Sequence, residues 1–292
     1  MLFFIKKRKE EERMKKIITT LVIVLIGITL VACGNTEKVF NFEQGYITVG
    51  MEADYPPFNW METSPNEYNH PLEGSTGSYV AGYDVEVAKE IAKQLGLELK
   101  IKAIPWGSLG SALKTGEIDL IIAGMSPTAE RKRTISFTDV YYMSNHVVVV
   151  SKEGAYANIT NLNQLKGAKG VGQIGTIYAE LVDYVKNNYG STSLPVRDTV
   201  PLISQDITSG TADFTVVEKP VALGMVEAND KLKIVLDTTE NIFNVNDEDR
   251  ELAIGHRKVD TELQQKINEI LATITQETRD LWMEQAVSRA AN

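Results

Sequence analysis

The sequence predicts an α/β fold that is divided into two compact lobes. The chain has 292 residues, which is long for one simple core and suits two lobes of ordinary domain size. From residue 46 onward, segments with strand patterns alternate with segments that have helix patterns, as they do in layered α/β proteins. Hydrophobic residues make up 43% and charged residues 24%, which is normal for a folded domain.

The first α/β set starts with a strand at residues 47–49 and a long polar connection at 58–82. Asp84 is placed to cap a helix that Gly96 ends, because Asp favours the N-cap and Gly the C-cap. Three elements follow in turn: an alternating strand at 97–103, a short helix through Leu113 that stops at Gly116, and a largely apolar strand of the buried type at 118–123.

A polar turn follows that apolar strand. Ser126 is a good N-cap, Pro127 suits the first helical position, and Arg131 would then lie in the second turn of a helix. Val147 to Val150 is an all-valine run that predicts a strand leaving the first lobe.

The second α/β set is predicted in the same way. Gly175-Thr176 makes a tight turn between a strand and a helix, and Glu218 stands at the end of a later strand. The predicted elements are a strand at 170–174, a helix at 177–186, strands at 213–217 and 232–236, and terminal helices over about 260–281.

The first 32 residues have the pattern of a secretory signal peptide. A basic lead with seven Lys or Arg is followed by an apolar stretch over 17–32, which matches the n-region and h-region of such signals. An uncleaved membrane anchor is the alternative. Met14-Lys15-Lys16 also has the character of a natural start, which makes residues 1–13 a candidate start-site overcall.

The single cysteine, Cys33, comes directly after this apolar stretch. Leu30 to Asn35 resembles a bacterial lipoprotein signal, in which cleavage precedes the cysteine and lipid is attached to it. The resemblance implies palmitate-type acyl chains on Cys33, a lipidated tether over 33–40, and export to the outer face of the cell membrane. Several acyl chains would anchor the protein well, since each buried CH₂ contributes roughly 0.8 kcal/mol.

Composition excludes several other functions. The chain carries a net charge of −9, and the part after the basic lead is more acidic still, so it repels nucleic acid. One cysteine cannot form an internal disulfide, and the histidines His70, His146 and His256 lack metal-ligand spacing. We therefore expect no metal and no cofactor.

Three predicted strand ends carry groups that suit a small zwitterion. In open α/β sheets, ligands bind beyond the carboxyl ends of strands. Ser126 and Arg131 follow one strand, and an arginine fork matches a carboxylate. The helix start after Gly175-Thr176 favours an anion, and Glu218 could accept from an ammonium. Together they match the backbone of an amino acid.

Each of these residues also has a structural explanation. Arg131 lies in the run Glu130 to Arg133, and such a run is usually a solvated helix face. Glu218 next to Lys219 could be a weak surface pair. Tyr55 and Trp106, taken singly, are more often packing residues than ligand platforms.

The joint pattern is more specific than its parts. Val49 to Phe58, Gly82 to Val85, Ala123 to Arg131 and Ile135 to Thr138 resemble signatures of the family 3 extracellular solute-binding proteins. That family comprises polar amino-acid receptors of ABC importers, and the similarity runs from about Tyr46 to near Trp282.

The resemblance implies a type II periplasmic-binding-protein-like fold, with two hinge strands and the ligand in the interlobe cleft. Lobe 1 would comprise residues 40–146 plus 240–292, and lobe 2 residues 147–239. The hinges would be the Val147–Val150 run and the stretch near residues 235–237.

The resemblance also implies a role for each candidate residue. Arg131 and Thr176 would hold the ligand α-carboxylate, and Ser126 with the Gly124 backbone would contact the α-amino and carboxylate groups. Glu218 falls where the family usually has Asp, which binds the α-ammonium. The remaining positions are Tyr55 and Trp106, which would sandwich the ligand side chain, and Glu52, an acidic position near its end.

The implied function is capture of a polar amino acid, a basic one or glutamine, and its delivery to an ABC permease by a monomeric, non-enzymatic protein. Glu52 suits either side chain, because a carboxylate accepts hydrogen bonds from both. Two alternatives stay open at this stage. One is a dehydratase-like enzyme on the same scaffold, in which Glu218 would act as a general acid. The other is a sensor or receptor for another small ligand.

Overall fold

The computed structural model describes residues 38–238 and 240–290, so the predicted signal peptide and Cys33 lie outside the described residues. The chain divides into two compact units, residues 1–38 and 39–292, and the fold below is that of the second unit. None of the helices in the described part of the chain is long and apolar enough to cross a membrane.

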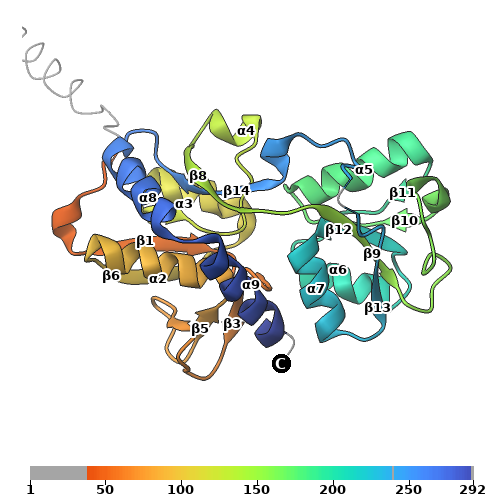
Figure 1. Cartoon of the computed structure of the whole chain (residues 1–292), viewed down its shortest axis with the longest axis horizontal. Helices are drawn as coiled ribbons and strands as arrows, with labels where there is room; N and C mark the ends of the chain where they lie inside the picture. Colours follow the sequence, from red (N-terminus) through yellow and green to blue (C-terminus); the bar gives the residue numbers. More distant parts are fainter. Residues whose placement is uncertain (1–37, 239, 291–292) are drawn as a thin grey trace, which may run out of the picture. The chain divides into compact units, whose positions relative to one another are not determined.

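The second unit contains two five-stranded sheets (Figure 1). The first sheet has the order β6-β1-β7-β14-β8, with β1 parallel to β6 and β7 and with β14 antiparallel to its two neighbours. Its strands are β1 (Tyr46–Met51), β6 (Glu98–Ala103), β7 (Leu120–Ile121), β8 (Ser136–Met143) and β14 (Glu251–His256).

Helices from both ends of the chain accompany this sheet. The C-terminal pair α8 and α9 contacts α2, which follows the first strands of the chain. The helices are α2 (Tyr83–Leu95), α3 (Leu109–Thr115), α4 (Ala129–Lys132), α8 (Thr261–Thr273) and α9 (Gln276–Ala290), with short 3₁₀ turns η1 (Phe42–Gln44), η2 (Trp106–Ser108) and η4 (Asp247–Asp249).

The second sheet has the order β11-β10-β12-β9-β13, and α5, α6 and α7 surround it (Figure 1). β9 runs antiparallel to both β12 and β13, which places Glu218 opposite His146. The elements are β9 (His146–Ser151), η3 (Leu162–Leu165), β10 (Lys169–Gly170), α5 (Ile177–Tyr189), β11 (Thr192–Ser193), α6 (Val200–Thr208), β12 (Phe214–Glu218), α7 (Lys219–Ala228) and β13 (Leu232–Val235).

The chain passes between the two sheets twice. β8 ends at Met143 in the first sheet and β9 begins at His146 in the second, while β13 ends at Val235 and β14 begins at Glu251 back in the first sheet. The Val147–Val150 run lies inside the second sheet, directly after the first crossing. Two lobes joined by two crossings confirm the predicted fold class. We call them lobe 1 and lobe 2.

Three local predictions were wrong. The segment 58–82 is not a plain connection, because it forms most of a small sheet in the order β2-β3-β5-β4. The strands of this small sheet are all antiparallel to their neighbours: β2 (Asp54–Tyr55), β3 (Asn59–Glu62), β4 (His70–Pro71) and β5 (Tyr79–Ala81).

The other two errors concern helix caps. Gly82 is the N-cap of α2, so Asp84 lies in the first turn, where it is buried and bonded to tertiary partners instead. Thr128, not Ser126, caps α4, and its Oγ1 accepts from the Arg131 N–H at 3.3 Å. In both cases a neighbouring residue that also suits an N-cap, Gly82 or Thr128, takes that position instead.

A buried ion triad fastens the C-terminal segment to lobe 1. The Arg257 guanidinium lies 3.1 Å from an Asp119 oxygen and 2.9 Å from an Asp260 oxygen, and all three side chains are buried. Asp260 also accepts the Phe40 N–H at 2.7 Å. Because removal of one partner would leave a buried charge uncompensated, these contacts hold the first and last segments of the unit together.

Candidate functional site

One cavity brings together all eight predicted ligand-binding residues. The space between its walls, counted together with its opening to solvent, is about 330 Å³. Residues from both lobes line it: Glu52, Tyr55, Trp106, Gly124, Ser126, Arg131, Gln173, Thr176, Ile177, Tyr178 and Glu218.

Arg131 is held at the boundary between the lobes. One guanidinium nitrogen donates to the Ser126 carbonyl at 2.9 Å, and the other donates to the Gly175 carbonyl of lobe 2 at 3.2 Å. Its guanidinium lies 5.0 Å from the Trp106 ring centroid, and the Trp106 Nε1 also donates to Gly175 at 3.0 Å. Arg131 is therefore not on a solvated helix face. It presents a planar cation beside an aromatic wall of the cavity.

Helix α5 begins at the cavity, as the turn chemistry predicted. Gly175 has a φ of +67°, which glycine adopts without strain, and Thr176 is the N-cap. The Thr176 hydroxyl accepts from the Tyr178 N–H at 3.2 Å and donates to the Gln173 carbonyl at 2.8 Å. The helix start, with its unpaired N–H groups and positive dipole end, faces a site that could hold a carboxylate.

Gly124 and Ser126 form the floor of the site in lobe 1. Gly124 has a φ of +58°, and a Cβ there would lie 2.6 Å from the Tyr55 ring, so only glycine fits. Its N–H donates to the Tyr141 hydroxyl at 3.1 Å, so a ligand contact at Gly124 would have to use the carbonyl oxygen. Ser126 is buried and lines the same cavity.

Asp84 supports this floor from behind. It accepts from the Tyr141 hydroxyl at 2.7 Å and from the Asn59 side-chain nitrogen at 2.8 Å, and Asn59 in turn accepts the Ala53 N–H at 2.7 Å. Burial raises the Asp84 pKa from 3.8 to about 7, while these hydrogen bonds lower it. One buried carboxyl therefore ties both cavity-lining segments, at residues 52–55 and at 124, to helix α2.

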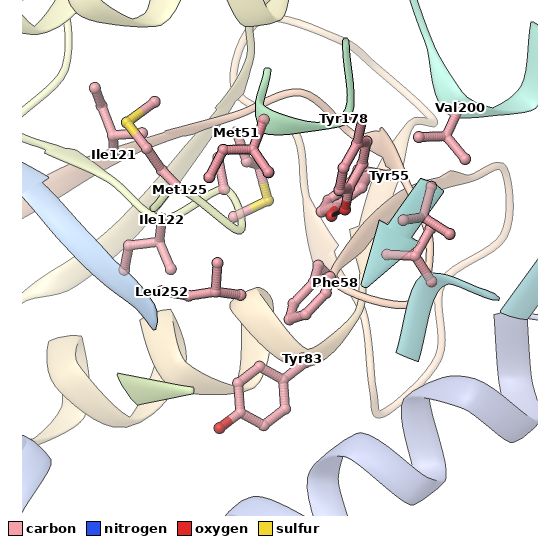
Figure 2. Close-up of a cluster of buried hydrophobic side chains, with 14 of the residues drawn as sticks. Met51, Tyr55, Phe58, Tyr83, Ile121, Ile122, Met125, Tyr178, Val200 and Leu252 are labelled. Atoms are coloured by element: carbon pink, nitrogen blue, oxygen red, sulfur yellow. Dashed lines mark hydrogen bonds between the residues drawn. The ribbon is translucent and has the colours of Figure 1, made fainter. Parts of the chain in front are cut away.

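Glu218 is enclosed by tyrosines. It is 3% exposed, and its Oε2 accepts hydrogen bonds from the hydroxyls of Tyr55 in lobe 1 and Tyr178 in lobe 2, which also contact each other. Figure 2 shows the two rings side by side with their oxygens together. Burial raises the pKa of Glu218 from 4.5 to about 7, although the tyrosines and Arg131 oppose this shift. It is not a surface pair with Lys219.

Glu52 occupies another part of the cavity. Both of its carboxylate oxygens accept from the Gln173 side-chain nitrogen, at 2.9 and 3.1 Å, and that nitrogen also donates to the Asp198 carbonyl. Burial raises the pKa of Glu52 from 4.5 to about 7, and the nearby Asp54 adds to the rise while Gln173 opposes it. Shifted carboxyls in a cavity are typical of functional sites.

The sequence analysis missed three lining residues: Gln173, Ile177 and Tyr178. Gln173 lies two residues before the Gly175 turn, and the turn itself was a signal that its neighbours face the same cavity. Tyr178 is in the first turn of α5 and is one of the buried residues of this helix, so nothing in the sequence pattern distinguished it from a packing residue. Within the described residues, no group of three potential metal ligands is assembled.

The comparisons identify the family. The model of bacterial extracellular solute-binding proteins, family 3, matches residues 47–284. The chain belongs to this family. It is similar to the arginine-binding extracellular protein ArtP of Bacillus subtilis, with 34% identity over 84% of this chain and 87% of the relative. It is also 30% identical to the L-cystine-binding protein TcyJ of Escherichia coli, over 79% of this chain and 77% of the relative.

Solved structures of the family have the same fold. An ancestral arginine-binding protein bound to arginine has 32% identity and a TM-score of 0.66, over 82% of this chain and 97% of that one. A mutant of the arginine-binding protein ArgBP from T. maritima has 30% identity and a TM-score of 0.67, over 84% and 96%. The family 3 signatures in the sequence therefore predicted both the family and its two-lobed fold.

Proposed function

We propose that this chain captures a basic amino acid, preferentially L-arginine, outside the cell and delivers it to an ABC importer. The charge of the cavity carries this proposal. Two carboxyls and one guanidinium line it: the partly buried Glu52, the buried Glu218 and Arg131. Arginine has two cations and one carboxylate, so every charge on the ligand would meet a charge of opposite sign.

Each group of the ligand has a partner in this arrangement. Arg131 and the N-terminus of α5 at Thr176 would bind the α-carboxylate. Glu218, together with Ser126 and the Gly124 carbonyl, would bind the α-ammonium. The side chain would lie between Tyr55 and Trp106, whose rings favour a flat cation, and would end at Glu52.

Capture would be coupled to closure of the lobes. Arg131 belongs to lobe 1 while Thr176 and Glu218 belong to lobe 2, so the ligand makes its full set of contacts only when the lobes are closed. It would therefore stabilise the closed state through contacts that the open state lacks. A permease could then distinguish the loaded protein from the empty one.

The relatives support a basic ligand and keep glutamine as the second choice. ArtP is an arginine-binding protein, and solved structures show an ancestral arginine-binding protein bound to arginine and an ancestral arginine-binding protein bound to glutamine. Glu52 could accept from an amide as well as from a guanidinium. The guanidinium adds charge, which a carboxylate in a cavity of low polarity binds more strongly.

The proposal extends to location and domain organisation. We propose that residues 1–32 are a signal peptide, that Cys33 carries the lipid anchor, and that the protein works as a monomer at the outer face of the membrane. Residues 40–146 plus 240–292 would move as lobe 1, and 147–239 as lobe 2. In accord with the family, we assign the chain a binding role rather than a catalytic one.

Calorimetric titration of the form that begins at Gly34, stripped of carried ligand by unfolding and refolding, tests the function. We expect tight one-to-one binding of L-arginine, with L-lysine and L-glutamine weaker. Binding of none of the twenty amino acids would contradict the proposal. Binding or turnover of a cyclic carboxylate would then support the dehydratase-like alternative.

A further inference from the structure

The site holds Glu218 in an asymmetric way. Both tyrosine hydroxyls converge on Oε2, while Oε1 accepts no hydrogen bond from any residue that the structure describes. Glu218 lines the cavity, so Oε1 is the oxygen left to meet a ligand there. A carboxylate can accept about four hydrogen bonds, and in Glu218 the two tyrosines supply two of them, both to Oε2.

The two tyrosines differ in how they are attached. Tyr178 belongs to lobe 2, as Glu218 does, and its ring is buried against His146 at 6.3 Å between centroids. Its N–H is capped by Thr176 in the first turn of α5. Tyr55 belongs to the small sheet that follows β1 in lobe 1, and it stacks on Phe58 at 5.3 Å. The Tyr178 contact lies within one lobe, whereas the Tyr55 contact crosses the cleft.

We propose that Tyr178 is a positioning residue for ligand binding, which donates to Oε2 of the Glu218 carboxylate and thereby holds Oε1 toward the ligand ammonium. This inference rests on the proposed function of the site. A glutamate side chain has three rotatable bonds, and a fixed partner within its own lobe restricts them. Tyr55 completes the arrangement on closure, when its hydroxyl reaches the same oxygen.

Other charged or titratable groups lie near Glu218, and each has a defined charge state or pKa shift. The Arg131 charge lowers the pKa of Glu218, while the pKa values of Asp84 and Tyr142 are raised by burial first and by the Glu218 charge in addition. His146, opposite Glu218 in the sheet, has its pKa lowered to about 4 by burial and is neutral near pH 7. Tyr178 is therefore one of the few donors that favour the ionised form, and loss of its hydroxyl should raise the Glu218 pKa further.

The test is Tyr178→Phe in the full-length chain purified in detergent, with L-arginine titrated between pH 5.5 and 9. We expect affinity at pH 7 to fall about tenfold or more, because a hydrogen bond to a charged group is lost. The difference in affinity between the variant and the wild type should shrink toward pH 9. The reason is that a higher Glu218 pKa shifts the pH range in which protonation of this carboxylate weakens binding, and higher pH restores the ionised form. Tyr142→Phe is the matched control, since Tyr142 does not line the cavity, and it should keep the wild-type profile.

A second measurement does not depend on the ligand. The side-chain carboxyl carbon of Glu218, assigned with Glu218→Gln, can be titrated by ¹³C NMR in wild type and in Tyr178→Phe. A higher midpoint in the variant supports the inference, and an unchanged midpoint overturns it. If the wild type fails to bind arginine while the midpoint still rises, the proposed ligand is wrong and the positioning role stands. Thermal unfolding of Tyr178→Phe verifies that the variant is folded.

Discussion

The two glutamates of the cavity have the same pKa of about 7 but are held in different ways. Glu218 is 3% exposed and receives two hydroxyls on one oxygen. Glu52 is only partly buried and shares one amide nitrogen, from Gln173, between both oxygens. The first carboxylate is fixed by donors from two lobes, and the second is held by a single neutral side chain.

This difference matches the two parts of an amino acid. The α-ammonium is the same in every amino acid, so a rigid partner such as Glu218 serves all of them. The side chain varies, and Glu52 faces both the main cavity and a second one lined by Asp54 and Asp198. Glu218 should therefore determine affinity for amino acids in general, whereas Glu52 should determine which amino acid is preferred.

The largest effect should come from Arg131, because every amino acid has the α-carboxylate that this residue would bind. Arg131→Ala removes the partner of the α-carboxylate, and we expect affinity for every amino acid to fall by several hundredfold or more, since breaking a buried pair costs about 3–5 kcal/mol. Calorimetry measures this loss. Arg133→Ala is the control, because its side chain is 73% exposed. Near-normal binding in Arg131→Ala would refute the site assignment.

A smaller and selective effect should come from Glu52→Gln. We expect arginine affinity to fall roughly 10- to 100-fold, because the guanidinium loses a charged partner worth about 1.5–3 kcal/mol. L-Glutamine should change little, and the preference between the two ligands would then reverse or vanish. Glu98→Gln, an exposed change on β6, is the matched control. Equal losses for both ligands would mean that Glu52 is no more selective than Glu218.

Gly124→Ala should disturb the Glu218 end through Tyr55. The added Cβ would lie 2.6 Å from the Tyr55 ring, and alanine would be strained at a φ of +58°. We expect about a tenfold loss of affinity, the same for arginine and glutamine, from roughly 1–3 kcal/mol of strain and displacement. Gly110→Ala in α3 has open space and should bind normally. A loss confined to arginine would assign Gly124 to the side-chain end instead.

The smallest effect should be the pH dependence that comes from the Glu52 carboxyl. Since the folded-state pKa of Glu52 is raised from 4.5 to about 7, its contribution to the free energy of unfolding is greatest below pH 4.5 and falls as pH rises to 7. Arginine needs the ionised form, so affinity should rise over the upper part of that range and binding near pH 7 should release protons. Calorimetry in buffers of different ionisation enthalpy measures this release, and Glu52→Gln should reduce it. Proton uptake would contradict the assignment.

Local patterns predicted many of the elements but chose poorly between neighbouring residues. The strand β6, the caps at Gly96 and Gly116 and the start of α5 are local features, and all of them are confirmed. The sheet within 58–82 was missed, because its strands are two to four residues long and too short for a periodic pattern. α6 and α7 were not predicted either, although each has a proline in its first turn.

The sequence by itself determined the family, the two-lobed α/β class and eight candidate residues, because strand ends and turn residues depend on short segments and the signatures keep their spacing. Only the tertiary structure showed that these residues share one cavity. It also decided the roles of Gln173 and Tyr178, as well as the raised pKa values of Glu52 and Glu218. The reason is physical: burial and hydrogen bonding between Glu218 and Tyr55, which are 163 residues apart, arise only once the two lobes face each other.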